Sequence, residues 1–328
     1  MTTLDEIRQP VNEALCELDR MVERHFADDK SPVAEMLAYA LAARGKGVRP
    51  LTVLLSAAAC SATGRVSTRA QLAAMLVEMI HVASLVHDDV IDESMMRRGR
   101  PSVNARWQSR NAVVVGDYIL ARAVSVGLSS AQYDLVQHIT GSIAVLCEGE
   151  VLQSRHAAAR DTDRESYLEI IRRKTASLLA VSASSGALAA GAAPERVEAM
   201  RRYGELLGMA FQIKDDIMDY TSACSATGKP ACNDLREGKI TLPLIEVLEP
   251  AGEAHRRELL DALAECGGDA SKIDFVRSAV EREGGIERAS EVMKAYLQRA
   301  LSVLAGLPPS QYRDALALLC TYVAERER

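Results

Sequence analysis

Apolar residues recur with the period of an α-helix along nearly the whole of this chain. Hydrophobic residues make up 48% of the sequence, much of it Ala, Leu and Val, while only 4% of the residues are aromatic. This composition favours helices over sheets, and no segment shows the every-second-residue alternation of a half-buried strand. We therefore expect an all-α protein.

The helical stretches are separated by short segments that contain Gly, Pro, Asp or Ser, the residues that stop or cap helices. Such breaks fall, for example, at 63–67, 160–163, 191–194 and 221–238. The pattern predicts about ten to twelve helices, most of them about 12–28 residues long. No linker rich in Pro, Gly or Ser divides the 328 residues. We therefore expect a single domain over residues 1–328.

Charge and cysteine usage exclude several classes of function. The net charge is −6 and no large basic tract occurs, so nucleic acid is not an expected partner. The seven cysteines are scattered without a CxxC pair, which argues against a disulfide framework or a zinc site and for a reducing cytoplasm. The most apolar stretch, 176–193, is rich in Ser and Gly. It predicts a packed core helix, so we expect a cytoplasmic protein without stable membrane insertion.

A first acidic cluster ends an apolar helix that is predicted to begin near Gln71. Asp88 and Asp92 are four residues apart and so share one helix face, with Asp89 beside them. Like charges at this spacing repel each other and oppose the dipole at a helix C-terminus. Both costs suggest a bound cation. Alone, the cluster could equally be a solvated acidic helix end, because single motif matches are often coincidental.

A second acidic cluster repeats this pattern at the end of another apolar helix. Asp215 and Asp219 share a face, and Asp216 follows Asp215. If the two helices face each other, the clusters form one oxygen-rich site. Hard carboxylate oxygens suit Mg²⁺, which takes few protein ligands and bridges substrate phosphates. The pair of clusters therefore predicts a magnesium–diphosphate site.

Basic side chains accompany both clusters and could bind a diphosphate. They lie directly after the first cluster, at Arg97, Arg98 and Arg100, and in three further segments, Arg44–Pro50, Arg172–Thr175 and Gly228–Lys239. Taken singly, the three segments have ordinary interpretations. They could be a helix-breaking loop, a surface helix face, and a turn before a helix that starts near Pro243.

In this order of motifs, from about Gly45 to Pro243, the chain resembles the trans-type polyprenyl diphosphate synthases. The resemblance implies an isoprenoid synthase fold, with helices around a deep central apolar cavity, usually in a homodimer. It implies isopentenyl diphosphate and an allylic diphosphate as substrates. It also implies Mg²⁺ as the cofactor, with about three ions per active site when substrate is bound.

The resemblance assigns roles residue by residue. The metal ligands would be Asp88, Asp89 and Asp92 on the allylic diphosphate, and Asp215, Asp216 and Asp219 at the facing metal. The isopentenyl diphosphate contacts would be Lys46, Arg49, His81 and Arg98. The allylic diphosphate contacts would be Arg97, Lys174, Thr175, Gln212, Lys229 and Lys239. The residues counted as catalytic would be Asp88, Asp92, Lys174, Asp215 and Lys229. For His81 the alternative is an ordinary core histidine, although it lies seven residues before Asp88 on nearly the same helix face.

The segment Cys147–Gln153 resembles the acidic mid-chain helix motif of the family, which faces the cavity. Two other positions depart from the family pattern. Gly47 stands where the family often has Arg, so the isopentenyl site would lack one cation unless Arg44 replaces it. The loop 222–228 is less acidic than its family counterpart, so its closure over the substrates is expected to differ.

The implied reaction follows from charge. Magnesium and cationic side chains stabilise the departing diphosphate, so that the allylic C–O bond ionises. The double bond of isopentenyl diphosphate attacks the allylic cation, and the released diphosphate accepts the proton that is lost. An apolar cavity keeps water from quenching the cation.

Product length is predicted to depend on Ala83 and Ser84, five and four positions before Asp88. Both are small, whereas short-chain members of the family commonly carry aromatic residues there. One helical turn rises about 5.4 Å, close to one isoprene unit, so a helix over 71–89 could flank roughly five units. This favours a hexaprenyl to nonaprenyl product, with octaprenyl at the centre. The alternative is that the cavity floor lies on another helix.

Four alternatives remain at this stage. A short-chain farnesyl or geranylgeranyl diphosphate synthase would share all the motifs. A terpene cyclase would normally lack the second aspartate motif and the isopentenyl contacts. A non-catalytic subunit of a heteromeric synthase would usually have lost an acidic motif. A helical magnesium-binding scaffold without catalysis would leave the ordered basic motifs unexplained.

Overall fold

The computed structural model describes residues 2–27, 31–42, 45–221 and 232–326. It is 80% helical, which confirms the expected all-α class. In chain order the elements are α1 (Leu4–Arg8), η1 (Gln9–Val11), α2 (Asn12–Phe26), α3 (Ala34–Ala42), α4 (Val48–Cys60), α5 (Thr68–Ile91), β1 (Met96–Arg97), β2 (Arg100–Pro101), α6 (Val103–Ser129), α7 (Tyr133–Ala159), α8 (Arg164–Ile171), η2 (Arg172–Ala176), α9 (Ser177–Ala189), α10 (Pro194–Thr221), α11 (Asn233–Arg236), α12 (Leu242–Leu248), α13 (Glu253–Glu265), α14 (Ala270–Arg282), α15 (Gly285–Leu304) and α16 (Gln311–Glu325).

The predicted breaks at 63–67, 160–163 and 191–194 are confirmed. Ser67, for example, caps α5 by accepting a hydrogen bond from the backbone N–H of Ala70. The structure contains more helices than predicted, because short ones such as α1, α11 and α12 are too short for periodicity to reveal. A two-stranded hairpin, β1 with β2, was also not expected.

The chain divides into two compact units. The first unit comprises residues 1–144, 178–204 and 301–319, and the second comprises 145–177, 205–300 and 320–328. The expectation of a single domain stays a prediction.

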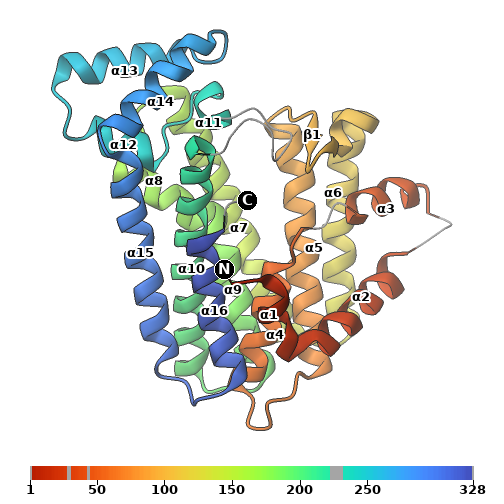
Figure 1. Ribbon diagram of the computed structural model, residues 1–328. Helices are drawn as coiled ribbons and strands as arrows, with labels where there is room; N and C mark the ends of the chain where they lie inside the picture. Colours follow the sequence, from red (N-terminus) through yellow and green to blue (C-terminus); the bar gives the residue numbers. More distant parts are fainter. Residues whose placement is uncertain (1, 28–30, 43–44, 222–231, 327–328) are drawn as a thin grey trace. The chain divides into compact units, whose positions relative to one another are not determined.

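In the first unit, α5 packs against α4 and α6 (Figure 1). The residues of α5 are apolar on nearly every side, which is typical of a helix enclosed by others. Helix α9 approaches α4 closely at Gly186, where a Cβ atom would come within 2.8 Å of the Ser56 Cβ. Helix α9, from the apolar stretch 176–193, is almost entirely buried, as expected for a core helix.

Two of the described helices, α5 and α6, are long and apolar enough to cross a membrane by length and composition alone. In α5, 72% of the most apolar window is buried inside the protein, which is the pattern of a core helix. In α6 the figure is 39%, and Val113, Val114 and Leu128 are exposed along it. Helix α6 therefore presents an apolar face.

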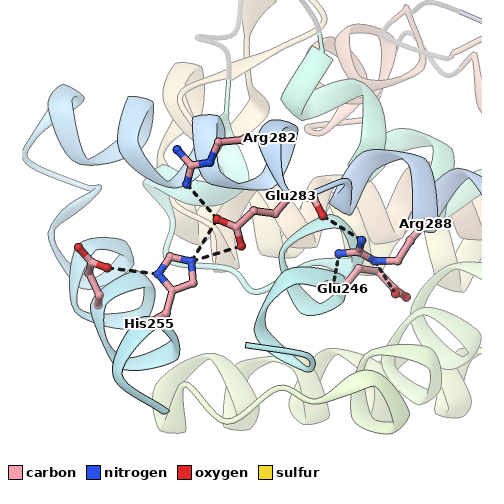
Figure 2. Close-up of polar contacts among 6 residues, drawn as sticks. Glu246, His255, Arg282, Glu283 and Arg288 are labelled. Carbon is pink, nitrogen blue, oxygen red and sulfur yellow. Dashed lines mark hydrogen bonds and ion pairs between the residues drawn. The ribbon is translucent and has the colours of Figure 1, made fainter. Parts of the chain in front are cut away.

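In the second unit, α12 is buried along its whole length, and Gly285 at the start of α15 packs against Val247 of α12. Helices α13 and α14 form a pair beside it (Figure 1). Figure 2 shows the polar contacts that join these elements. Arg288 of α15 donates to the backbone carbonyls of Glu246 and Glu283, at 2.6 and 2.9 Å.

His255 on α13 lies between two carboxylates in this network. Its Nδ1 is 3.2 Å from Glu258 Oε2, and its Nε2 is 3.1 Å from Oε1 of Glu283, at the end of α14 (Figure 2). Hydrogen bonds to these two carboxylates raise the pKa of His255 above its usual 6.5. A raised pKa in the folded state means that protonation stabilises the fold below about pH 6.5, and that this stabilisation is lost as the pH rises through the folded value.

Replacing His255 with glutamine is therefore expected to destabilise the protein more at pH 5.5 than at pH 8.5. Urea unfolding of both proteins at the two pH values measures the difference. His25→Gln provides a control, because burial lowers the pKa of His25. Its effect on the free energy of unfolding should therefore change with pH in the opposite direction. Equal destabilisation by His255→Gln at both pH values would contradict the assignment.

Candidate active site

The first acidic cluster lies at the end of α5, in the first unit. Asp88 occupies the last turn, and Asp92 is the residue that caps the helix. The backbone N–H of Asp92 donates to the Asp88 carbonyl at 2.8 Å, so the two carboxylates are one turn apart as predicted. Both lie at the negative end of the helix dipole, where a cation is stabilising.

Asp89 differs from its two neighbours because its side chain is buried. It is 3% exposed, and Arg97 on β1 binds it through Nε at 2.8 Å and through Nη2 at 2.7 Å. Asp89 is predicted above to bind metal and Arg97 to bind diphosphate, whereas the structure pairs them with each other. The pair anchors the hairpin on α5, and the two ligand roles stay predictions.

The hairpin that carries Arg97 turns at Arg98 and Gly99. Both residues have positive φ, 53° and 76°, as the central residues of a type I′ turn require. Glycine adopts this conformation freely, while arginine does so at a cost of about 1–2 kcal/mol. Gly45 leaves room for the Arg98 guanidinium, because a Cβ there would overlap it.

A cluster of cations surrounds His81 in the same unit. Arg49 Nη1 lies 2.9 Å from His81 Nε2. Burial, followed by the charges of Arg49, Arg98 and Arg97, holds the pKa of His81 well below its usual value. The ring is therefore neutral and accepts the Arg49 hydrogen bond. Three of the four predicted isopentenyl contacts, Arg49, His81 and Arg98, are thus grouped here. The two positive charges suit the binding of an anion, which favours the ligand role of His81 over that of an ordinary core histidine.

The remaining predicted contact, Lys46, is exposed, and its carbonyl accepts a hydrogen bond from Arg8 at 2.5 Å. Its neighbour Gly47 precedes α4 with φ of 64°. A side chain at this position would strain the backbone, so the glycine is explained by the local turn. Arg44, the proposed substitute cation, lies outside the described residues.

The second unit contains a cavity of about 160 Å³. Polar residues from several elements line it together with the apolar Ile170, Ile171 and Ile240: Gln153, Tyr167, Lys174, Thr175, Gln212, Asp216, Asp234 and Lys239. Four of the predicted allylic contacts therefore share one cavity. Thr175 Oγ1 donates to Gln212 Oε1 at 2.8 Å, and Gln212 Nε2 donates to Asp216 Oδ1 at 2.8 Å.

Lys174 and Thr175 lie on a π-helical turn, η2, between α8 and α9. Such turns are rare and frequently occur at functional sites. Helix α7 approaches this turn at Gly149, where a Cβ would lie 2.7 Å from the backbone nitrogen of Lys174. The adjacent Glu150 is buried and binds Lys174 Nζ at 2.6 Å. The mid-chain acidic motif thus positions a predicted diphosphate contact.

The three acids of the second cluster have three different environments. Asp216 is 4% exposed and accepts a 2.6 Å hydrogen bond from the Tyr167 hydroxyl. Burial, followed by the charge of Asp234, raises the pKa of Asp216 well above its usual value. Asp219 accepts hydrogen bonds from the backbone N–H groups that begin α11, at 3.1 and 2.9 Å. Asp215 is 39% exposed and binds Arg326 at 2.9 Å.

These carboxylates fit a hard divalent cation. Asp215 already pairs with a cationic group, and the available donors are oxygens. Among the described residues, no group of three or more His, Cys, Asp or Glu side chains is placed to hold a metal by itself. Mg²⁺ does not require such a group, because it commonly binds one or two carboxylates together with waters and substrate phosphates.

Ala83 and Ser84 lie on α5, five and four residues before Asp88. Ala83 is 2% exposed, and the Ser84 hydroxyl donates to the His81 carbonyl at 2.9 Å.

The predicted contact Lys229 and the loop 222–228 lie outside the described residues. Lys239 lines the cavity and pairs with Glu237 at 2.5 Å.

Sequence reasoning missed several residues of the site. Tyr167 and Asp234 line the cavity. Neither could be singled out from the sequence, because Tyr167 is one of nine tyrosines and Asp234 lies in a predicted turn outside the two acidic clusters. Arg326 lies in the charged sequence Ala-Glu-Arg-Glu-Arg, which matches no motif. Glu150 lies in the Cys147–Gln153 segment, and Gln153 at the end of this segment lines the cavity.

The chain is similar to several known proteins along nearly its whole length. A family model described as polyprenyl synthetase matches residues 30–281. A protein of Rhodobacter capsulatus named all-trans-nonaprenyl-diphosphate synthase (geranyl-diphosphate specific) is 36% identical over 98% of this chain and 97% of its own. An octaprenyl diphosphate synthase of Haemophilus influenzae is 32% identical over 99% and 98%. The crystal structure of a polyprenyl synthase from Caulobacter crescentus CB15, complexed with calcium and isoprenyl diphosphate, has a TM-score of 0.92 at 30% identity and covers 100% of this chain and 99% of that one.

Proposed function

The chain belongs to the polyprenyl synthetase family, and on that premise we propose that it is a Mg²⁺-dependent all-trans polyprenyl diphosphate synthase. It has the all-α isoprenoid synthase fold and is a prenyltransferase. In the proposed reaction, isopentenyl diphosphate is condensed head to tail, repeatedly, onto an allylic diphosphate. The observation that carries the proposal is the cavity of the second unit, where Lys174, Thr175, Gln212 and Lys239 come together.

The residues around this cavity suit the binding of an allylic diphosphate. Lys174 and Lys239 supply positive charge, and Thr175 and Gln212 supply hydrogen-bonding groups. Ile170, Ile171 and Ile240 line the same cavity and exclude water. In the first unit, Arg49, Arg98 and the neutral His81 would hold isopentenyl diphosphate. These groups orient the substrates and stabilise the diphosphate as the C–O bond breaks.

Mg²⁺ on the allylic diphosphate would be held by Asp88 and Asp92 of the first cluster, and a second metal by Asp215 and Asp219 of the second. When bound, Mg²⁺ supplies charge neutralisation of the leaving diphosphate. Asp216, buried against Tyr167 and Gln212, is better suited to fixing the orientation of α10 than to direct coordination. No side-chain nucleophile is required.

The product is proposed to be long, with octaprenyl as the central length and a quinone side chain as its use. Similar proteins are named heptaprenyl, octaprenyl and nonaprenyl synthases. Helix α5 extends twenty residues before Asp88, which is about 30 Å. A relative 34% identical to this chain is named short chain isoprenyl diphosphate synthase, so a short-chain product is the second candidate.

The protein is further proposed to be cytoplasmic and to act as a homodimer. The exposed apolar face of α6, with Val113, Val114 and Leu128, is a candidate for the contact between copies. A heteromeric assembly is the alternative, since one relative is named as component 2 of a heptaprenyl diphosphate synthase. Sedimentation of the purified protein alone distinguishes the two.

Incubation with Mg²⁺, farnesyl diphosphate and radiolabelled isopentenyl diphosphate tests the activity. The expected result is label in prenyl diphosphates that contain more than one added unit. Chromatography then sizes the products. No incorporation with any allylic primer or divalent metal would refute the enzyme. A farnesyl product from a shorter primer, without further extension, would refute only the long chain.

Replacing Ala83 with phenylalanine is expected to shift the products toward shorter chains, because a ring one to two turns before Asp88 would block the growing chain. The shift is read as a change in the ratio of product lengths at equal total incorporation. Ala73→Phe, deeper on the same buried helix, should leave the shorter products unaffected. An unchanged distribution in Ala83→Phe would place the cavity floor elsewhere.

A further inference from the structure

Arg326 lies one residue beyond α16, close to the end of the chain, yet its side chain is only 6% exposed. Its guanidinium carbon stacks 3.7 Å from the centroid of the Phe211 ring. Its Nη2 donates to the Phe211 carbonyl at 2.7 Å and forms an ion pair with Asp215 Oδ1 at 2.9 Å. All of these residues belong to the second unit.

The two partners of Arg326 share one face of α10. Phe211 and Asp215 are four residues apart, so the ring and the carboxylate are adjacent on the helix surface. Their combination fits a planar cation that stacks with its face and donates with its edge, which arginine does and lysine does not. An arginine side chain loses about 2 kcal/mol of rotamer entropy when it is fixed. Several simultaneous contacts are therefore needed to hold it.

The arrangement contains a second sign that it is specific. The Nε atom of Arg326 is buried and has no hydrogen-bond partner among the described residues. Burying an N–H without a hydrogen bond costs about 1–3 kcal/mol, so the other contacts of the guanidinium must offset this cost. The guanidinium is turned so that its far edge reaches Asp215.

Asp215 is the first acid of the second cluster. In the function proposed above, its carboxylate binds Mg²⁺. A guanidinium at Oδ1 occupies part of the acceptor capacity of the Asp215 carboxylate. It also places a positive charge beside any divalent ion that binds the same carboxylate, and the two cations repel each other.

We propose that Arg326 is the built-in counter-ion of Asp215: it positions the carboxylate on α10 and competes with the divalent metal for it. The inference rests on the proposed function for the metal role of Asp215. Metal binding to Asp215 then has to overcome the charge of the guanidinium or displace it from Oδ1.

Binding of Mn²⁺ in the presence of inorganic pyrophosphate tests this without catalysis. Free Mn²⁺ is measured by electron paramagnetic resonance for the wild type and for Arg326→Gln. The glutamine keeps a polar side chain but removes the competing charge, so Mn²⁺ is expected to bind about three- to tenfold more tightly. Arg313→Gln is the matched control: this arginine lies on the same helix, α16, and pairs with its neighbour Asp314. It should leave the affinity unchanged.

Equal or weaker Mn²⁺ binding by Arg326→Gln, at a wild-type level of binding in the control, would overturn the inference and leave the proposed function intact. Absence of Mn²⁺ binding by every protein, the wild type included, would overturn the metal role of Asp215 and the inference with it. If Arg326→Gln does not fold, Phe211→Leu serves instead. It removes the ring that holds the guanidinium, and a smaller increase in affinity is expected, while no increase refutes the competition.

Discussion

Replacing Asp88 with asparagine is expected to lower kcat by about 10²- to 10³-fold. The substitution preserves shape but removes one negative charge from the end of α5, where Asp88 and Asp92 are one turn apart. A neutral amide is a poor ligand for Mg²⁺ compared with a carboxylate. Steady-state incorporation of labelled isopentenyl diphosphate at saturating substrate measures the loss.

Asp261→Asn is the control for this variant, because Asp261 is an exposed carboxylate on α13. It removes the same charge and is expected to retain full activity. Thermal unfolding of Asp88→Asn shows whether the variant is folded, so that a loss of activity is not mistaken for unfolding. Activity within threefold of the wild type would contradict a metal role for Asp88.

Replacing Gly149 with alanine is expected to destabilise the protein and to weaken binding of the allylic diphosphate. The new Cβ would lie 2.7 Å from the Lys174 nitrogen and 2.8 Å from the Arg173 Cβ. Because the first of these atoms is backbone, η2 itself must move. Overpacking of this kind costs about 1–3 kcal/mol of unfolding free energy. The displaced Lys174 should also raise the KM for the allylic diphosphate by about tenfold.

Gly141→Ala is the matched control on the same helix, α7, where a Cβ would meet no other atom within 4 Å. Alanine is the better helix former by about 1 kcal/mol, so this variant should be stabilised. Urea unfolding and steady-state kinetics of both variants provide the comparison. If Gly149→Ala were as stable and active as Gly141→Ala, the close approach of α7 to η2 would be unimportant.

The sequence was most informative where physical rules act over short distances. The helix breaks at 63–67 and 160–163 follow from capping and turn residues, and the spacing of Asp88 and Asp92 follows from helix geometry. The gathering of Lys174, Thr175, Gln212 and Lys239 in one cavity was reached through the family resemblance, because these residues are up to 65 positions apart.

The remaining features depend on contacts that no local pattern encodes. The π-helical turn at Lys174 packs closely against Gly149, more than twenty residues earlier. The pairing of Asp89 with Arg97 depends on the hairpin, which is too short for strand periodicity to predict. The contact between Arg326 and Asp215 joins residues that are more than one hundred positions apart.

The turn at Arg98 and Gly99 has a consequence for the thermodynamics of ligand capture. Fixing the backbone of one residue in a single conformation opposes association by about 1–2 kcal/mol when it happens during binding. Here the left-handed conformation of Arg98 is selected when the hairpin folds, and the Asp89–Arg97 pair holds the hairpin on α5. An incoming anion therefore meets Arg97 and Arg98 on a hairpin that is already ordered. The loss of backbone freedom occurs during folding and not in each catalytic cycle.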